Sequence, residues 1–227
     1  MGGSEFYWQN WANYEALVIY SNLVIDDDSD AQRINDQLIK NLSFAITNGF
    51  AKNGSFSRFT NIYLHPTKGD CGMLYDDRQW LALSMLSLYK HKQVSVEIKS
   101  KLLADVTKLY DLIINTDMPY DKNGSYLGLF WAPEPLSYHN AITNELFFVM
   151  TARLFDITKN KTYLANSLLQ YTWLFKDKGI FGVNNNSNNN YDLFLDGYHG
   201  PEDTNTLPGG GVYTYNQGVV LEGLAYL

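Results

Sequence analysis

The sequence predicts an all-α protein built from paired helices, and three observations support this. Apolar residues recur at three- and four-residue steps through most segments, which is the period of an amphipathic helix. Short turns alternate with long loops that are rich in glycine and aromatic residues. The resulting helix pairs recur roughly every 60 to 70 residues. Long loops at one rim of a helical scaffold commonly carry its functional residues, so we expect the site there.

Two helices are expected in the first fifty residues. The first runs over residues 7–25, where large apolar side chains repeat at helical spacing. The second begins near Asp30, a favourable N-cap, and ends at Asn48 and Gly49, a typical helix stop. The long stretch over residues 50–75 contains several glycines and is expected to be irregular.

Five further helices are expected after this stretch. The turn signal at Asp121 to Gly124, between short aromatic runs, predicts a small hairpin in the middle of this part. A second long loop, rich in asparagine and glycine, is expected over residues 179–211. The helices themselves are expected over residues 76–91, 95–115, 139–158 and 163–176, and from about Tyr215.

Composition and charge exclude several classes of function. A net charge of −7 opposes phosphate binding, so we expect no nucleic-acid partner. No apolar run reaches the roughly 18 residues that a membrane-spanning helix needs. The single cysteine, Cys71, excludes a cysteine-based zinc site, and the four scattered histidines and missing nucleotide loops predict no metal and no cofactor. The opening residues lack a secretion signal, which predicts a cytoplasmic protein unless such a signal has been removed.

Aromatic and amide side chains are abundant. The chain holds 17 Tyr, 12 Phe and 5 Trp, together with 22 Asn. Flat rings suit the C–H faces of sugars and amides suit their hydroxyls, so this composition is typical of a carbohydrate cleft. The alternative is that the rings simply fill the core.

Two adjacent carboxylates, Asp76 and Asp77, open the helix that follows the first long loop. One interpretation is helix capping, which stabilises a helix start by roughly 0.5 to 2 kcal/mol. The other is catalytic. Neighbours on a helix point about 100° apart, so one carboxylate can stay ionised while the other keeps a proton, as glycoside hydrolysis requires.

The surrounding sequence resembles a known family. Residues 75–89, YDDRQWLALSMLSLY, resemble the signature helix of glycoside hydrolase family 76, the endo-α-1,6-mannanases. Residues 128–164, then Asp196 and Gly197, then residues 213–227 resemble three further family motifs in the same order. The resemblance covers nearly the whole chain, with two departures.

The departures are His139, where the family usually has lysine, and Glu222, where a small residue is common. They leave the aspartate pair untouched, but they bear on the exact substrate. The resemblance implies an (α/α)6 toroid of six inner and six outer helices. The last helix stays apolar to Leu227 without a stop signal, so we expect residues 1–227 to be the N-terminal part of a single catalytic domain, truncated after about the seventh helix.

The resemblance also implies roles for individual residues. Asp76 would be the nucleophile and Asp77 the general acid/base of a retaining glycosidase that cleaves α-1,6-mannosidic linkages. The implied substrate-binding residues lie at helix starts or in the long loops: Tyr75, Trp131, Asn140, Asn144, Asp196, Asn216 and Gln217. The alternative for each amide is capping of its own helix, for Trp131 core packing and for Asp196 a turn.

Three hypotheses for function remain open at this point. The first is hydrolysis of mannan or mannose-containing glycans by a monomer. The second keeps the same chemistry but transfers mannose to an acceptor, as in cell-wall relatives of the family. The third is a helical protein that binds glycans without catalysis, in which the aspartates only cap a helix.

Overall fold

The computed structural model describes residues 7–24, 32–33, 36–37, 39–40, 75–132, 138–177, 180–181, 193–199 and 211–227. The chain folds as two compact units. The first comprises Met1–Met73 and Trp80–Ile113, and the second comprises Leu74–Gln79 and Ile114–Leu227. Within the described residues, no helix is long and apolar enough to cross a membrane.

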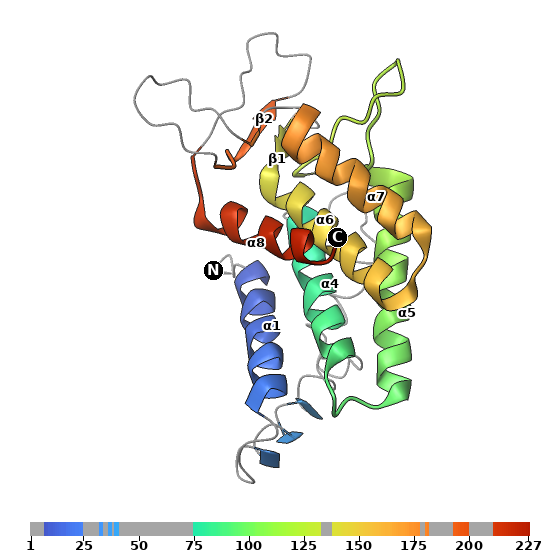
Figure 1. Ribbon diagram of the computed structural model, residues 1–227, viewed down its shortest axis with the longest axis vertical. Helices are drawn as coiled ribbons and strands as arrows, with labels where there is room; N and C mark the ends of the chain where they lie inside the picture. Colours follow the sequence, from blue (N-terminus) through green and yellow to red (C-terminus); the bar gives the residue numbers. More distant parts are fainter. Residues whose placement is uncertain are drawn as a thin grey trace, which may run out of the picture. The chain divides into compact units, whose positions relative to one another are not determined.

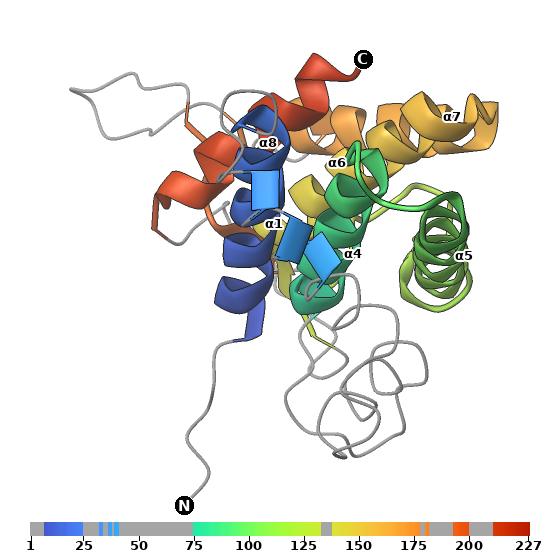
Figure 2. The same cartoon turned by 90° about the horizontal axis from the view of Figure 1, so that it is seen from below.

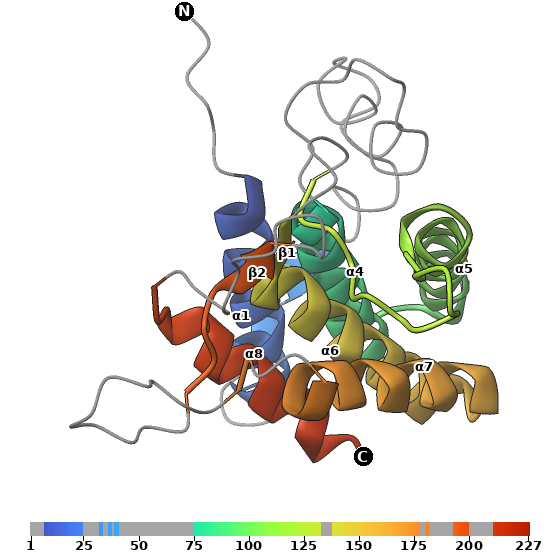
Figure 3. The same ribbon diagram turned by 90° about the horizontal axis from the view of Figure 1, so that it is seen from above.

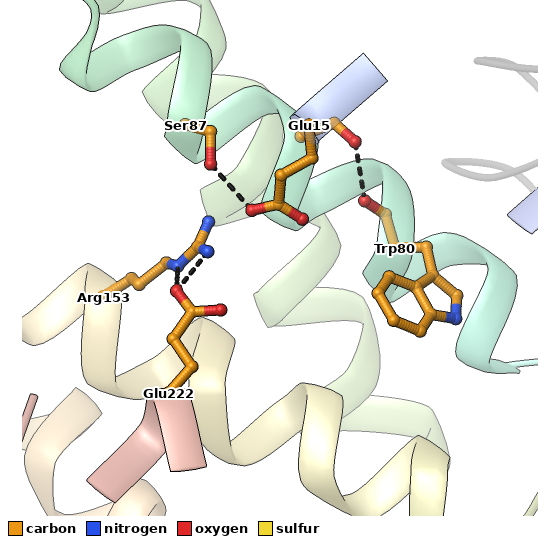
Figure 4. Close-up of polar contacts among 6 residues, drawn as sticks. Glu15, Trp80, Ser87, Arg153 and Glu222 are labelled. Carbon is orange, nitrogen blue, oxygen red and sulfur yellow. Dashed lines mark hydrogen bonds and ion pairs between the residues drawn. The ribbon is translucent and has the colours of Figure 1, made fainter. Parts of the chain in front are cut away.

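The first unit is made of α1 (Tyr7–Val24), most of α4 (Tyr75–Lys90) and α5 (Val96–Leu112), drawn from blue to green in Figure 1. α1 and α4 lie side by side, and two serine side chains of α4 donate hydrogen bonds to α1. Ser84 Oγ donates to the Trp11 carbonyl at 2.8 Å. Ser87 Oγ donates to Glu15 Oε1 at 2.7 Å, as Figure 4 shows. α5 buries a stripe of Leu102, Val106 and Leu109 as its periodicity predicts.

The second unit is organised around α6 (Ala141–Thr158), on which α7 (Lys161–Thr172) and α8 (Thr214–Ala225) pack (Figures 1 and 3). Every residue from Ala141 to Leu154 is buried, as expected for a helix covered on all sides. α8 approaches α6 closely at Gly223, where a Cβ would overlap the ring of Phe148.

Four short elements among the described residues lie wholly or mostly in the second unit. β1 (Tyr138–Asn140) and β2 (Gly197–His199) pair antiparallel beside the start of α6 (Figure 3). Figure 2 gives the opposite view, in which α7 lies beside α6. The π-helical turn η2 (Ile113–Asp117) begins at the last residue of the first unit, and η3 (Trp173–Asp177) extends α7.

Most of the predicted helices are confirmed, with ends displaced by a few residues. The fourth and sixth end as α-helices at Leu112 and Thr172 and continue as the two π-helical turns. The predicted hairpin is confirmed by the Tyr120–Tyr126 bridge, with Gly124 at φ 82° in its turn. The strand pair was not predicted. Most of the predicted second helix, and the whole stretch over residues 50–74, lie outside the described residues.

Candidate active site

The predicted aspartate pair lies in the first turn of α4. Asp76 is 8% exposed and Asp77 is 6% exposed, so both carboxyl groups are shielded from water. The helix start is tied down by the Tyr75 amide, which donates to the Trp131 carbonyl at 2.9 Å. The Tyr75 ring is buried beneath the Arg78 guanidinium, 4.8 Å from the ring centroid, and therefore supports the helix start.

The two carboxylates do not have equal electrostatic environments. Burial, and then the negative charge of Asp77, raise the pKa of Asp76 to about 7. Backbone N–H groups of the helix start oppose this rise, and the charge of Asp196 adds to it. A pKa near 7 keeps Asp76 protonated for about half of the time at neutral pH. The pair can therefore hold one proton between two carboxyl groups, which is the state an acid–nucleophile pair needs.

The structure brings Asp196 to the same unit through the β1–β2 pair. The Ala141 amide, at the start of α6, donates to the Asp196 carbonyl at 2.6 Å, and the Tyr138 hydroxyl donates to the Asp196 carboxylate. Gly197 is required here, because a Cβ at this position would overlap the backbone of His139 and Asn140. Gly197 therefore allows the close strand pairing, and the Asp196 backbone bonds to the start of α6. The Asp196 carboxylate takes no part in either contact and bonds to Tyr138 instead.

The start of α8 carries a pair of stacked rings. The rings of Tyr213 and Tyr215 are 5.2 Å apart with an interplanar angle of 4°. Burial is the largest cause that raises the pKa of Tyr215 to about 12, followed by the charge of Asp196, with smaller contributions from Tyr213, Asp76 and Glu145. The residues that raise the pKa of Tyr215 therefore come from four places: α4, α6, the residue that caps α8, and the residue before β2.

Three of the predicted amides use their side chains within the protein. Asn144 makes four hydrogen bonds: its Oδ1 accepts from the Leu129 amide and from Gln170 Nε2, and its Nδ2 donates to the carbonyls of Leu129 and Asn140. No donor or acceptor of Asn144 is left for a sugar. Asn140 caps α6, with Oδ1 accepting from the Thr143 amide at 3.3 Å.

Gln217 is engaged in the same way as Asn144. Its Oε1 accepts from the Phe194 amide at 2.9 Å, and its Nε2 donates to the carbonyls of Phe194 and Tyr213. This side chain holds the segment that leads to Asp196 against α8. The capping and structural interpretation therefore fits Asn140, Asn144 and Gln217.

Asn216 differs from these amides. It is fully buried on α8, and both its Oδ1 and its Nδ2 lack a hydrogen-bond partner among the described residues. A buried amide of this kind is rare in folded proteins and calls for a ligand or water. Trp131 is the exposed member of the predicted set, with 37% of its surface accessible and its ring set edge-on to Tyr138.

Glu145 was not among the predicted site residues, yet it is the most deeply buried acid among the described residues of the unit. It lies in the second turn of α6 with no exposed surface, and neither carboxyl oxygen has a hydrogen-bond partner among the described residues. Burial, and then the charge of Asp196, raise the pKa of Glu145 well above its usual value, so this position favours the protonated acid over the carboxylate. An acid among apolar neighbours, in Asn144-Glu145-Leu146-Phe147, was the available signal.

No group of three or more His, Cys, Asp or Glu side chains among the described residues is arranged to hold a metal ion. The site can nevertheless carry out acid–base and nucleophilic chemistry with its own carboxyl groups. Its parts are an aspartate pair in which the pKa of Asp76 is raised, a third carboxylate at Asp196, an amide at Asn216 that has no hydrogen-bond partner among the described residues, and an exposed indole at Trp131.

Solved structures with a similar fold are (α/α)6 toroid proteins. A family 76 mannosidase from Bacteroides thetaiotaomicron superposes with a TM-score of 0.64 at 17% identity, over 100% of this chain and 58% of that one. The GH76A α-1,6-mannanase from Salegentibacter sp. HEL1_6 superposes with a TM-score of 0.62 at 19% identity, over 100% of this chain and 56% of that one. The predicted fold class is confirmed.

The chain belongs to glycosyl hydrolase family 76, whose family model matches residues 4–227. The mannan endo-1,6-alpha-mannosidase DCW1 of Saccharomyces cerevisiae is 37% identical over 90 residues, which are 40% of this chain and 18% of the yeast protein. An inactive variant of the Salegentibacter mannanase, with two consecutive aspartates replaced by asparagines, was solved with α-1,6-mannotriose. That structure gives a TM-score of 0.61 at 18% identity, over 97% of this chain and 54% of that one.

Proposed function

We propose that the protein containing this chain cleaves α-1,6-mannosidic linkages in mannan, with Asp76 and Asp77 as its catalytic pair. The observation that carries the proposal is the buried aspartate pair at the start of α4, in which the pKa of Asp76 is raised to about 7. The names of the relatives, a mannan endo-1,6-alpha-mannosidase and an α-1,6-mannanase, support mannan as the substrate. The variant described as inactive, with two consecutive aspartates replaced, supports the choice of this pair.

The proposed reaction retains the configuration of the anomeric carbon. A carboxylate oxygen of Asp76 forms a bond to this carbon while the bond to the glycosidic oxygen breaks, and Asp77 gives its proton to that oxygen. Water then gives a proton to Asp77, and its oxygen displaces Asp76 from the sugar. Both aspartates return to their starting states.

The raised pKa of Asp76 constrains the first step. In the ligand-free protein, burial and the charge of Asp77 favour a proton on Asp76, whereas attack requires Asp76 as a carboxylate. We propose that bound substrate moves this proton to Asp77, because the glycosidic oxygen offers Asp77 a hydrogen-bond acceptor. The macroscopic pKa near 7 then belongs to the pair and appears in the pH profile of the reaction.

The sugar ligands we propose are the residues that retain free capacity or exposed surface. Asn216 offers both polar atoms of an amide that has no hydrogen-bond partner among the described residues, Asp196 offers a carboxylate and Trp131 offers an exposed ring face. Asn140, Asn144 and Gln217 hold these elements in place through the hydrogen bonds described above. Tyr75 supports the start of α4.

The pair is tested by Asp76→Asn and Asp77→Asn in the full-length protein with linear α-1,6-mannan. We expect each change to lower kcat at least about a thousandfold, because Asp76 forms the covalent bond and Asp77 transfers a proton in both steps. A 2-fluoro mannosyl fluoride would trap the covalent intermediate, and peptide mass spectrometry should find the sugar on Asp76. Wild-type turnover in both variants would refute the proposal, and a sugar on Asp77 would exchange the two roles.

The same assay separates the other hypotheses. Transfer of mannose to an added acceptor faster than release to water would identify a transglycosidase with the same catalytic pair. Binding of mannan without turnover, unchanged by either aspartate substitution, would identify a non-catalytic glycan-binding protein.

A further inference from the structure

Tyr138 contacts two of the proposed sugar ligands. It is the first residue of β1, and its hydroxyl donates to the carboxylate of Asp196. Its carbonyl accepts from the Trp131 amide at 2.9 Å. Its ring meets the ring of Trp131 edge-on, with centroids 6.2 Å apart and an interplanar angle of 86°. One side chain is therefore fixed to both an acidic and an aromatic residue of the site.

These contacts continue to the aspartate pair. The Trp131 carbonyl accepts from the amide of Tyr75, the residue before Asp76, at 2.9 Å. A line of hydrogen bonds thus runs from the start of α4 through Trp131 and Tyr138 to Asp196. Because all of these residues belong to the second unit, a shift of Tyr138 would displace Trp131 and Asp196 together.

The chemistry of the phenol suits this position. Burial, the hydrogen bond to Asp196 and its negative charge raise the pKa of Tyr138 above its usual value, so the phenol stays a neutral donor. A hydrogen bond from a neutral phenol to a carboxylate is charge-assisted and fixes the plane of the acceptor. It occupies one carboxylate oxygen of Asp196 and leaves the other for a sugar hydroxyl.

We propose that Tyr138 is a positioning residue for substrate. Its hydroxyl orients the carboxylate of Asp196 and its ring sets the angle of the Trp131 ring, so that both side chains bind the same sugar. This inference rests on the proposed function, because its first test measures the binding of a mannose oligosaccharide. It differs from the proposed catalytic roles, since Tyr138 acts on the substrate only through Asp196 and Trp131.

The test is a double-mutant cycle of Tyr138→Phe and Asp196→Asn. Both are placed in the Asp76→Asn/Asp77→Asn form of the full-length protein, which we expect to bind substrate without turnover, and the Kd for α-1,6-mannotriose is measured by calorimetry. We expect Tyr138→Phe to weaken binding by about tenfold or more, as for loss of a charge-assisted hydrogen bond. With Asp196→Asn already present, Tyr138→Phe should change Kd by less than about twofold. Effects that multiply independently would overturn the proposal.

Tyr126→Phe is the matched control. The Tyr126 hydroxyl donates to Gln170 Oε1 at 2.7 Å, so the change removes a buried phenol-to-oxygen hydrogen bond in the same unit. A purely structural role for Tyr138 predicts the same behaviour in both variants, namely a lower Tm with Kd unchanged. In the catalytically intact protein, Tyr138→Phe should raise KM by about tenfold and change kcat by less than about threefold.

A second measurement does not depend on mannan. In protein labelled with ¹³C at tyrosine Cζ, the Tyr138 resonance, assigned from Tyr138→Phe, should titrate at lower pH in Asp196→Asn than in the wild type. An unchanged titration would overturn the link between Tyr138 and Asp196. If the parent form does not bind mannotriose but this titration shifts, the proposed function fails while the positioning contact stands.

Discussion

Asn144 and Asn216 are two buried asparagines on neighbouring helices that the sequence places in one class. Both lie in the first or second turn of a helix, both have no exposed surface, and both were predicted sugar ligands. Asn144 makes four hydrogen bonds within the protein, whereas Asn216 makes none with the described residues. Burial alone therefore does not distinguish an asparagine that supports the fold from one that can bind a ligand. The two differ in how much hydrogen-bonding capacity their side chains have left.

The comparison predicts a large loss of stability for Asn144→Ala. The change leaves the Leu129 amide and Gln170 buried without their partner, and each such group costs about 1 to 3 kcal/mol. We expect the free energy of unfolding to fall by roughly 2 to 6 kcal/mol, measured by urea denaturation. If Asn144→Ala and Asn216→Ala lower it equally, the distinction between the two residues is wrong.

The next largest effect concerns Asp76 and pH. Its pKa rises from 3.8 in the unfolded chain to about 7 in the fold, so the fold binds this proton more tightly. The resulting stability is fully present below pH 3.8 and is lost as pH rises towards 7 and above. Near pH 8 the loss amounts to roughly 4 kcal/mol.

Asp76→Asn cannot ionise and should escape this loss. We expect the variant to gain stability over the wild type as pH rises from 4 to 8, while it loses activity. Urea unfolding of both proteins at the two pH values measures the gain. A difference in stability that stays constant with pH would show that the raised pKa of Asp76 is wrong.

The parts of the molecule that sequence could predict are those with a local pattern. Helical periodicity located α1, α4, α5, α6, α7 and α8, and adjacent carboxylates after a long loop located Asp76 and Asp77. The β1–β2 pair could not be found, because it joins three-residue strands that are far apart in the chain and carry no alternation.

The roles of the individual polar residues were equally hidden from sequence. Asn144 and Gln217 were predicted to bind sugar because they stand at helix starts, but their partners are backbone groups of Leu129 and Phe194 in irregular segments. Only the folded chain shows which amides are already satisfied. The same holds for Glu145, whose burial and lack of a hydrogen-bond partner among the described residues depend on tertiary packing.

The smallest effect on stability, and the sharpest test of the comparison, belongs to Asn216→Ala. The change removes a buried amide that makes no hydrogen bond with the described residues, so we expect the free energy of unfolding to change by less than about 1 kcal/mol. The Kd for α-1,6-mannotriose should nevertheless rise by about tenfold or more, because the sugar hydroxyls lose both a donor and an acceptor. Asn144→Ala supplies the reverse pattern and serves as the matched control. Unchanged affinity in Asn216→Ala would show that water, rather than substrate, satisfies this amide, and Asp196 and Trp131 would then be left as the proposed sugar ligands.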